Sequence, residues 1–407
     1  MSAPACAVDS FVAAPTALLS SYRAGDTLFS SPSTQLHARG SLRVVRESVN
    51  EGVADAAYKA LHDAARETGP LPLIGAVPFE ASAPSRLWIP AQAVHAAGQA
   101  RHAGAASTFA ASERNPVVEA QPSPARFREN VADAIASIRG GGLDKVVLSR
   151  SLRIQANVDV PQLVSRLLER MRDRNGYTFA IDLASAGGAP ACLVGASPEL
   201  LLSKRGAVVV SNPLAGSIAR AINPDEDCAR ARQLLSSAKD LHEHALVVSA
   251  VEAALAPHCL RLSVPREPVL ASTPTMWHLS TRVQGRLRDP EASSLRLALD
   301  LHPTPAVCGH PTASARALIR DVEGYPRDLF TGLVGWCDVN GDGEWAVTIR
   351  CALIDDTSAT VYAGAGIVDA SNPQLELEET TAKLRTMLSA MGLAHALELP
   401  EACGDTP

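Results

Sequence analysis

The sequence predicts an α+β fold. Segments with the alternating pattern of β-strands and segments with the period of helices are interleaved, without the regular alternation typical of a doubly wound parallel sheet. At 407 residues with 46% hydrophobic content, the chain can bury one large core or two ordinary ones. These two observations indicate the fold class and leave the number of domains open.

Composition and charge exclude several classes of protein. The formal net charge is -6 and both signs are mixed along the chain, so no basic face or polybasic tail is available for nucleic acid or anionic lipid. The first residues lack a positive charge before their apolar run, and no window approaches the roughly 18 apolar residues of a membrane span. The eight cysteines are far apart and form no CxxC pair. We expect a cytoplasmic protein with reduced thiols that binds neither nucleic acid nor membranes.

The first element with a clear period follows a possible connector at residues 111–124. Four apolar residues recur at helical spacing and three glycines then end the helix; these are Phe127, Val131, Ile135 and Ile138, followed by Gly140, Gly141 and Gly142. The next residues, LDKVVLSR, alternate as a strand. This strand holds Lys145 on the face opposite Val146 and Leu148.

The middle of the chain adds a helix around residues 163–171 and a series of strands. Residues 191–204 form two strand pieces that meet near Pro198, which places Glu199 at their junction. Residues 207–217 are expected to be a strand that runs into a Pro/Gly turn. Residues 223–255 are amphipathic and acidic at their start, as in one helix or two.

The C-terminal part predicts a hairpin and a last helix. Residues 329–339 and 344–354 flank the turn NGDG, and Arg350 is expected on the second strand, on the face opposite Trp345 and Val347. After the glycine-rich AGAG, Asn372 and Pro373 stand in cap positions of a helix. That helix carries an apolar stripe of Leu384, Met387, Leu388 and Met391.

Two helices each present a pair of carboxylates. Asp240 and Glu243 are three residues apart on one predicted helix, and Glu376 and Glu379 are three apart on another. If the two faces meet, a divalent cation with oxygen ligands is the usual compensation for the repulsion. By spacing alone, each pair could equally be a solvated helix face.

Other motifs are less informative. In LHEHALVV the two histidines lie about 200° apart around a helix and cannot bind one zinc ion together. DVNGDG lacks the glutamate that closes a calcium loop and is interpreted as a hairpin turn. AGAG and PLAGS are compatible either with tight turns or with backbone N–H groups that face an anion. Lys145 by itself could be a surface residue or a general base.

Taken in order, nine motifs resemble the isochorismate synthases of catechol siderophore pathways, in the chorismate-utilising enzyme family. They are DKVVLSR, GASPELLL, PLAGS, KDLHEH, TPTMWHL, HPTPAVCG, VGWCDVNGDGEWAVTIRCA, YAGAGIV and EET…K. The resemblance covers residues 27–393 and leaves an N-terminal segment, 1–26, and a tail, 394–407. It implies a single large chorismate-binding domain, similar to anthranilate synthase component I, with two packed β-sheets covered by helices, and a monomer is expected.

The resemblance also implies an isomerase that converts chorismate to isochorismate with Mg²⁺, feeding 2,3-dihydroxybenzoate synthesis. Lys145 matches the general base that activates water for attack at C2, and Glu199 matches the general acid that protonates the departing C4 hydroxyl. Glu243 and Glu379 match direct magnesium ligands, while Asp240 and Glu376 match positions that reach the ion through water. The positions that match substrate-binding groups are Gly216, Ser217, His278, Ala306, Arg350, Gly364 and Lys383.

Three alternatives are weighed against this function. Aminating relatives are disfavoured because aminodeoxychorismate synthases place a lysine at the position of Ala215, and anthranilate synthases place glutamine at that of Lys145. Salicylate synthases keep the lysine base and add pyruvate elimination, usually with threonine at the position of Ser217, and they are the main alternative. A catalytically silent chorismate-binding subunit would lack Lys145 or Glu199, and both are present.

Overall fold

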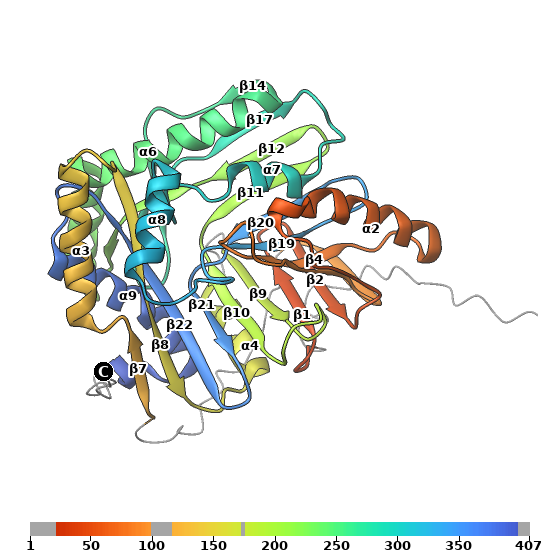
Figure 1. Ribbon diagram of the computed structural model, residues 1–407, viewed down its shortest axis with the longest axis horizontal. Helices are drawn as coiled ribbons and strands as arrows, with labels where there is room; N and C mark the ends of the chain where they lie inside the picture. The colour runs from red at the N-terminus through yellow and green to blue at the C-terminus, as the bar shows by residue number, and fades with distance from the viewer. Residues whose placement is uncertain (1–21, 99–115, 172–175, 398–407) are drawn as a thin grey trace, which may run out of the picture.

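The computed structural model describes residues 22–98, 116–171 and 176–397. It confirms the α+β class: the strands of the described ranges form three antiparallel sheets, and helices cover the two large ones (Figure 1).

Sheet A has ten strands. Their order is β18-β8-β22-β21-β10-β9-β1-β2-β6, and β7 pairs with the outer part of β8. The strands are β1 Thr27–Ser30, β2 Thr34–Arg39, β6 Gln92–Ala97, β7 Val118–Gln121, β8 Lys145–Gln155, β9 Tyr177–Asp182, β10 Cys192–Ser197, β18 Gly309–His310, β21 Cys351–Ile354 and β22 Ser358–Ile367.

Sheet B has nine strands in the order β14-β17-β12-β11-β20-β19-β4-β5-β3, and sheet C has three in the order β13-β16-β15. The strands of sheet B are β3 Arg43–Val45, β4 Leu73–Val77, β5 Arg86–Ile89, β11 Leu200–Arg205, β12 Val208–Asn212, β14 Cys259–Ser263, β17 Val283–Leu287, β19 Leu333–Cys337 and β20 Gly343–Val347. Those of sheet C are β13 Leu214–Ala219, β15 Val269–Ser272 and β16 Met276–Ser280.

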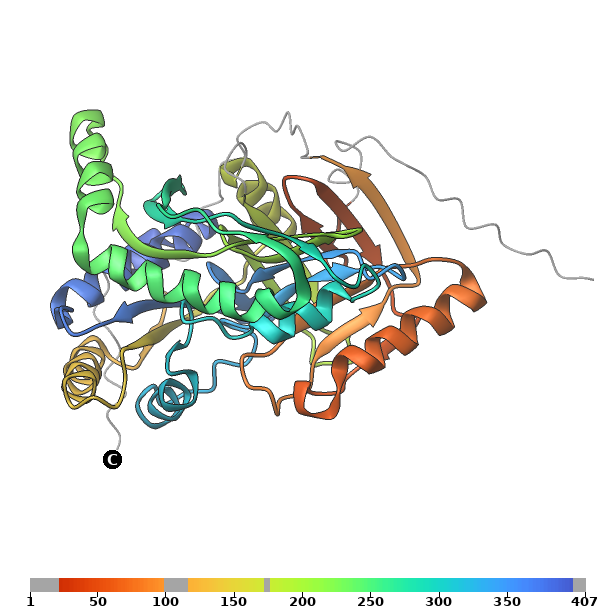
Figure 2. The same ribbon diagram turned by 90° about the horizontal axis from the view of Figure 1, so that it is seen from above.

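The helices lie outside the sheets, most of them on the two large sheets and one, residues 224–236, on sheet C. They are α2 Val53–Thr68, α3 Pro124–Arg139, α4 Val160–Met171, α5 Pro224–Ser236, α6 Ala238–Leu255, α7 Ser294–Leu301, α8 Thr312–Val322 and α9 Pro373–Met391, with short 3₁₀ turns η1 Val49–Glu51, η2 Ala256–His258 and η3 Ala394–Leu397. α4 and α9 pack on sheet A, and α3 and α8 gather at its β8 end (Figure 1). α6, α7 and α2 follow one another along the side of sheet B (Figure 2).

The main core lies between sheets A and B. Phe29 and Phe179 from sheet A meet Ile74, Trp88 and Val334 from sheet B in one cluster, and each of these side chains is almost fully buried. Alternation along the strands points one face of each sheet into this layer and the other toward the helices. The result is a four-layer arrangement that positions the ends of β8, β10 and β22 with little freedom.

Caps determine where the two carboxylate-bearing helices begin. Ser237 accepts a hydrogen bond from the N–H of Asp240, which starts α6 and divides residues 223–255 into two helices. Asn372 caps α9 and Pro373 occupies its first turn, as the sequence predicts. Gly392, in the left-handed conformation with φ 78°, ends α9.

Three local predictions are wrong. Arg350 does not lie on a strand: β20 ends at Val347 in sheet B, the chain crosses to β21 in sheet A, and Arg350 sits in the crossing with φ 52°. AGAG is not a tight turn, because Gly364 and Gly366 pair with Ser149 and Val147 inside β22. PLAGS is a strand with a register shift at Gly216, since strand pairing across the chain overrides the local turn signal.

The connector expected at residues 111–124 is replaced in part by β7, which pairs with β8; residues 111–115 lie outside the described ranges. The turn at residues 338–343 joins β19 and β20 as a hairpin, as predicted.

The six cysteines in the described ranges carry free thiols. Within the same ranges, none of the helices combines the length and apolar character needed to cross a bilayer.

Candidate active site

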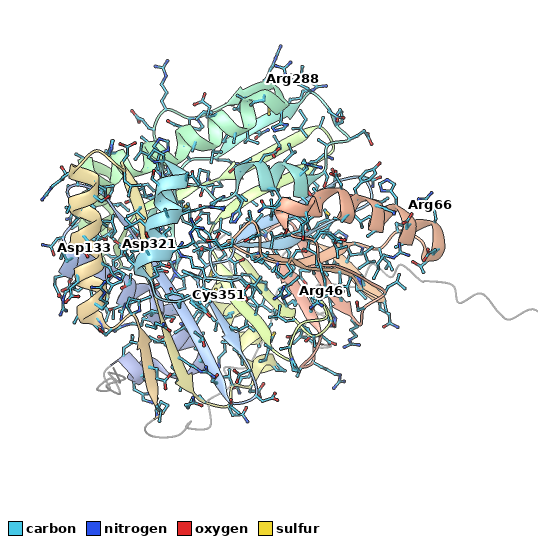
Figure 3. The ribbon with its side chains drawn as sticks, in the orientation of Figure 1. Arg46, Arg66, Asp133, Arg288, Asp321 and Cys351 are labelled. Carbon is cyan, nitrogen blue, oxygen red and sulfur yellow. The ribbon has the colours of Figure 1, made fainter. Side chains whose placement is uncertain are left out.

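One cavity of about 60 Å³ brings together most of the polar residues singled out in the sequence. It is lined by strands of sheets A and C, by the links that adjoin strands of sheet B, and by residues of α6 and α9. The predicted site residues that line it are Glu199, Gly216, Ser217, Glu243, His278, Ala306, Arg350, Gly364, Glu379 and Lys383. Cys351, the residue after Arg350, is labelled near the middle of the molecule in Figure 3 and is fully buried.

The three other predicted residues lie directly behind this wall. Lys145 is fully buried and its Nζ is 2.8 Å from Oε1 of Glu243. Asp240 packs against the backbone of Gly216. A Cβ atom added to Gly216 would lie 2.9 Å from the Cβ atom of Asp240. Glu376 is 1% exposed. The structure thus brings all the predicted positions into one region.

Lys145 opens β8 and points to the helix that carries Glu243. The 2.8 Å contact of its Nζ with Glu243 lacks hydrogen-bond geometry, so this nitrogen has no hydrogen-bond acceptor among the described residues. Gly366 of β22 makes this approach possible. A Cβ at Gly366 would overlap Oε1 of Glu243 and lie 3.1 Å from Cε of Lys145.

Glu199 lies in the link between β10 and β11, as predicted, and is 3% exposed. Burial raises its pKa to about 7, although the N–H of Leu214 and the charges of Lys145 and Arg350 act in the opposite direction. The hydrogen bond from Leu214 is long, at 3.5 Å. Glu199 is therefore a carboxyl that retains its proton up to neutral pH, which is the property of a general acid.

Glu379 and Lys383 form an ion pair within one turn of α9, with 2.5 Å between Nζ and Oε1. Ser217 donates a hydrogen bond of 2.9 Å to the same carboxylate oxygen, and Lys383 also donates to the carbonyl of Gly364 at 2.8 Å. Burial favours a higher pKa for Glu379, but Lys383 outweighs burial and the pKa is lowered. Glu379 is thus held as an anion at the cavity wall.

The remaining two carboxylates are less well compensated. Glu376 forms a 2.7 Å ion pair with Lys239, but its Oε2 atom is buried without a partner in the described residues. Burial and the neighbouring Glu379 raise the pKa of Glu376, and burial, with Glu243 and Glu379 contributing, raises that of Asp240. Both shifts indicate a site with an excess of negative charge.

The carboxylates fit a hard cation by charge and by chemistry. Four carboxylates gather near three lysine side chains, and one buried carboxylate oxygen lacks a partner in the described residues; oxygen ligands are those that Mg²⁺ prefers. Within the described ranges, no three His, Cys, Asp or Glu side chains are arranged to hold a metal by themselves. Completion of a coordination shell would therefore require water or substrate oxygens.

Arg350 and His278 are buried on the other side of the cavity. Burial lowers the pKa of Arg350 to about 10, so the guanidinium remains charged at neutral pH. Burial, with the charges of Arg350 and Lys383, lowers the pKa of His278 well below its usual value. His278 is thus neutral, and its Nε2 atom is buried without a partner in the described residues.

The sequence analysis missed Lys239, Gly366 and most of the apolar wall. A lysine beside a glutamate on a different helix has no local signature, and a glycine in a strand only hints at close approach. The missed apolar wall consists of Val147, Leu214, Val307, Phe330, Ile349 and Tyr362. His242 is exposed and His244 is buried against Thr281, in agreement with the exclusion of a zinc site.

Sequence comparison identifies similar proteins along nearly the whole chain. The model of the chorismate binding enzyme family matches residues 85–392. Isochorismate synthase DhbC of Bacillus subtilis is 45% identical over 393 residues, which cover 93% of this chain and 96% of the relative. The vibriobactin-specific isochorismate synthase of Vibrio cholerae is 43% identical and covers 84% of this chain and 85% of its own.

Comparison of structures gives the same relatives. The crystal structure of DhbC from Bacillus anthracis, described as a candidate 2,3-dihydroxybenzoate-specific isochorismate synthase, superimposes with a TM-score of 0.85 at 42% sequence identity. The match covers 93% of this chain and 99% of the other.

Proposed function

The chain belongs to the chorismate-binding enzyme family and is an isochorismate synthase, and we propose that Lys145 and Glu199 perform its proton transfers beside a magnesium site on α6 and α9. The names of its relatives support a place in 2,3-dihydroxybenzoate and siderophore synthesis. The observation that carries the assignment of roles is that a buried lysine and a buried carboxyl whose pKa is about 7 belong to one site, where the charge of Lys145 acts on Glu199.

The reaction moves a hydroxyl from C4 to C2 of the ring. Lys145 accepts a proton from a water molecule as that water forms a bond to C2 and the ring double bonds shift. Glu199 donates its proton to the C4 hydroxyl, which leaves as water. One water is consumed and one is released, so the atoms balance. The reaction requires Lys145 to begin without its extra proton and Glu199 to begin protonated.

Glu243 and Glu379 are the residues that would hold Mg²⁺, with Asp240 and Glu376 behind them. When bound, Mg²⁺ supplies positive charge to a carboxylate of the substrate. Ser217 and Lys383 orient Glu379 through the contacts described above, and Lys239 neutralises Glu376. These side chains therefore hold the carboxylates in place for a cation.

Chorismate carries two carboxylates, and the cavity offers groups suited to them. Arg350 presents a planar cationic fork and Lys383 a point charge. The register shift of β13 exposes the backbone of Gly216 and Ser217 to the cavity, and Gly364 leaves room beside Val147. His278, being neutral, is suited to a hydrogen bond rather than a charge.

Residues 27–393 are proposed to act as one catalytic unit. Support comes from the site itself, since its residues are drawn from segments as far apart in the chain as β8 and α9, and from strands and links between them. We also propose that the enzyme works in the cytoplasm as a monomer; the free thiols are compatible with a reducing compartment.

The test is incubation of purified protein with chorismate, with Mg²⁺ or with a chelator, followed by liquid chromatography with ultraviolet and mass detection. Lys145→Ala serves as the matched variant. We expect isochorismate from the wild type only when Mg²⁺ is present, and none above background from Lys145→Ala.

Each other outcome changes the proposal. Salicylate with an equal amount of pyruvate would assign the further elimination step to this cavity. Unchanged turnover in the chelator would contradict the proposed magnesium site. A fully active Lys145→Ala variant would contradict the proposed role of Lys145 as the base.

A further inference from the structure

A buried ion pair underlies the apolar wall of the cavity, on the side away from the carboxylates. Arg327 and Glu323 each have side chains that are 1% exposed, and they are linked by two contacts of 2.5 and 2.8 Å. Glu323 is the residue that follows α8, and Arg327 lies between α8 and β19. Removal of two charges from water is costly, and such a pair contributes little stability compared with apolar side chains of similar size.

The remaining donors of Arg327 are directed to backbone and side chains of the cavity wall. Its two terminal nitrogens donate to the carbonyls of Val307 and Val147, both at 2.7 Å. One of them also donates to the hydroxyl of Thr331 at 3.3 Å. All three of these acceptor residues line the cavity.

Glu323 connects the same pair to the strand that bears Lys145. Its Oε1 atom accepts hydrogen bonds from the N–H and the hydroxyl of Ser149, at 2.7 and 2.8 Å. The ring of Phe330, another wall residue, lies 5.9 Å from the guanidinium carbon of Arg327. The ion pair therefore joins β8, the segment that contains Val307 and the segment that contains Thr331.

We propose that Arg327, held in place by Glu323, is a positioning residue that sets the distance between Lys145 on β8 and the substrate-facing wall formed by Val307 and Thr331. The inference rests on the proposed function of the cavity. A planar guanidinium can donate to Glu323 and to two carbonyls in different directions at once, whereas an ammonium on a flexible chain cannot span them in the same geometry.

The test compares Arg327→Met, Arg327→Lys and Glu323→Gln with the wild type in steady-state conversion of chorismate. Misplacement of a catalytic group by about 1 Å costs about 100-fold in rate, and we expect Arg327→Met to lose about that factor in kcat/KM, with kcat lowered and KM raised. Arg327→Lys keeps the charge but not both carbonyl contacts, so we expect an intermediate loss of about tenfold.

The matched control is Lys204→Met, which removes another buried ion pair. Lys204 is in β11 of sheet B and is 1% exposed. Its Nζ lies 2.8 Å from Oδ1 of Asp342, and neither residue lines the cavity. We expect a lower Tm for this variant and values of kcat and KM within about twofold of the wild type. Assays are run well below the Tm of every variant.

Two outcomes overturn the inference: folded Arg327→Met and Arg327→Lys with wild-type kcat and KM, or a Lys204→Met variant with the same kinetic losses. If Arg327→Met does not fold, Arg327→Lys and Glu323→Gln decide the question in the same way. Failure of the proposed function is distinguishable, because the wild type itself would then not convert chorismate.

Discussion

At the scale of single residues, the site depends on side chains whose chemistry differs from that of the same groups in water. Glu199 is the clearest case, since burial raises its pKa to about 7. The carboxyl of Glu199 can donate a proton only while it is protonated. The pH dependence of kcat/KM reports the pKa values of the essential groups in the free enzyme. We therefore expect kcat/KM to fall as the pH rises through about 7.

The matched variant for this prediction is Glu199→Gln, which cannot donate a proton. We expect it to lose about 100-fold or more in kcat and to lose the basic limb of the pH profile. The raised pKa also favours the folded state at low pH, and this contribution is lost as the pH rises from the usual value of 4.5 to about 7. The Tm of wild type relative to Glu199→Gln should fall over that interval; a pH-independent difference would contradict the assignment.

Gly366 gives a second prediction at this scale. Any side chain there would enter the space between Lys145 and Glu243. We expect Gly366→Ala to fold but to lose about 100-fold in kcat/KM, because the lysine and its partner must separate. Gly142→Ala is the control, since its Cβ would lie no closer than 3.7 Å to a neighbour; equal kinetics for the two variants would show that the close approach has no part in the reaction.

At the scale of elements, α6 and α9 present the carboxylates from two directions. Asn372 and Ser237 start these helices, so the cap positions also determine which residues face the cavity. Glu379 and Lys383 share one turn, and Glu378, between Leu377 and Glu379, is exposed. The two neighbouring glutamates are therefore a natural pair for comparison.

We expect Glu379→Gln to raise the Kd for Mg²⁺ by tenfold or more and Glu378→Gln to leave it unchanged. A ligand that binds only the folded state raises Tm according to its concentration relative to Kd. Mg²⁺ titrations of Tm, in the absence of substrate, give a readout independent of turnover. An identical response from both variants would count against Glu379 as a ligand.

At the scale of the whole molecule, the cavity is formed where the three sheets meet, so its geometry depends on the core between sheets A and B. Phe179 is fully buried in that core and does not line the cavity. We expect Phe179→Ala to lower the free energy of unfolding by about 3–5 kcal/mol. The activity of each folded molecule should change little, because the side chain of Phe179 does not line the cavity.

Denaturant unfolding checks this prediction, with Leu260→Ala as the control. Leu260 is 57% exposed, and a substitution at such a surface position usually changes stability by less than about 0.5 kcal/mol. If Phe179→Ala unfolds at the same denaturant concentration as wild type, the inter-sheet layer is not what holds the two sheets together.

The amino-acid sequence by itself determined the features that depend on neighbours along the chain. Helix starts at Asn372 and Pro373, the hairpin at residues 338–343 and the strand that holds Lys145 all follow from local rules. The carboxylate pairs could be placed on helix faces from spacing alone, and the ordered motifs indicated the family. The roles of the individual site residues remain predictions.

Only the tertiary structure decided which of these local features meet. Periodicity indicates that Glu243 and Glu379 are on helix faces, but not that Lys145 and Lys383 lie in contact with them. Arg350 leaves its expected strand because the chain crosses there from sheet B to sheet A, and AGAG is held in a strand because β22 pairs with β8. Pairings between segments far apart in the chain depend on packing of the whole core, and that information is absent from any local window.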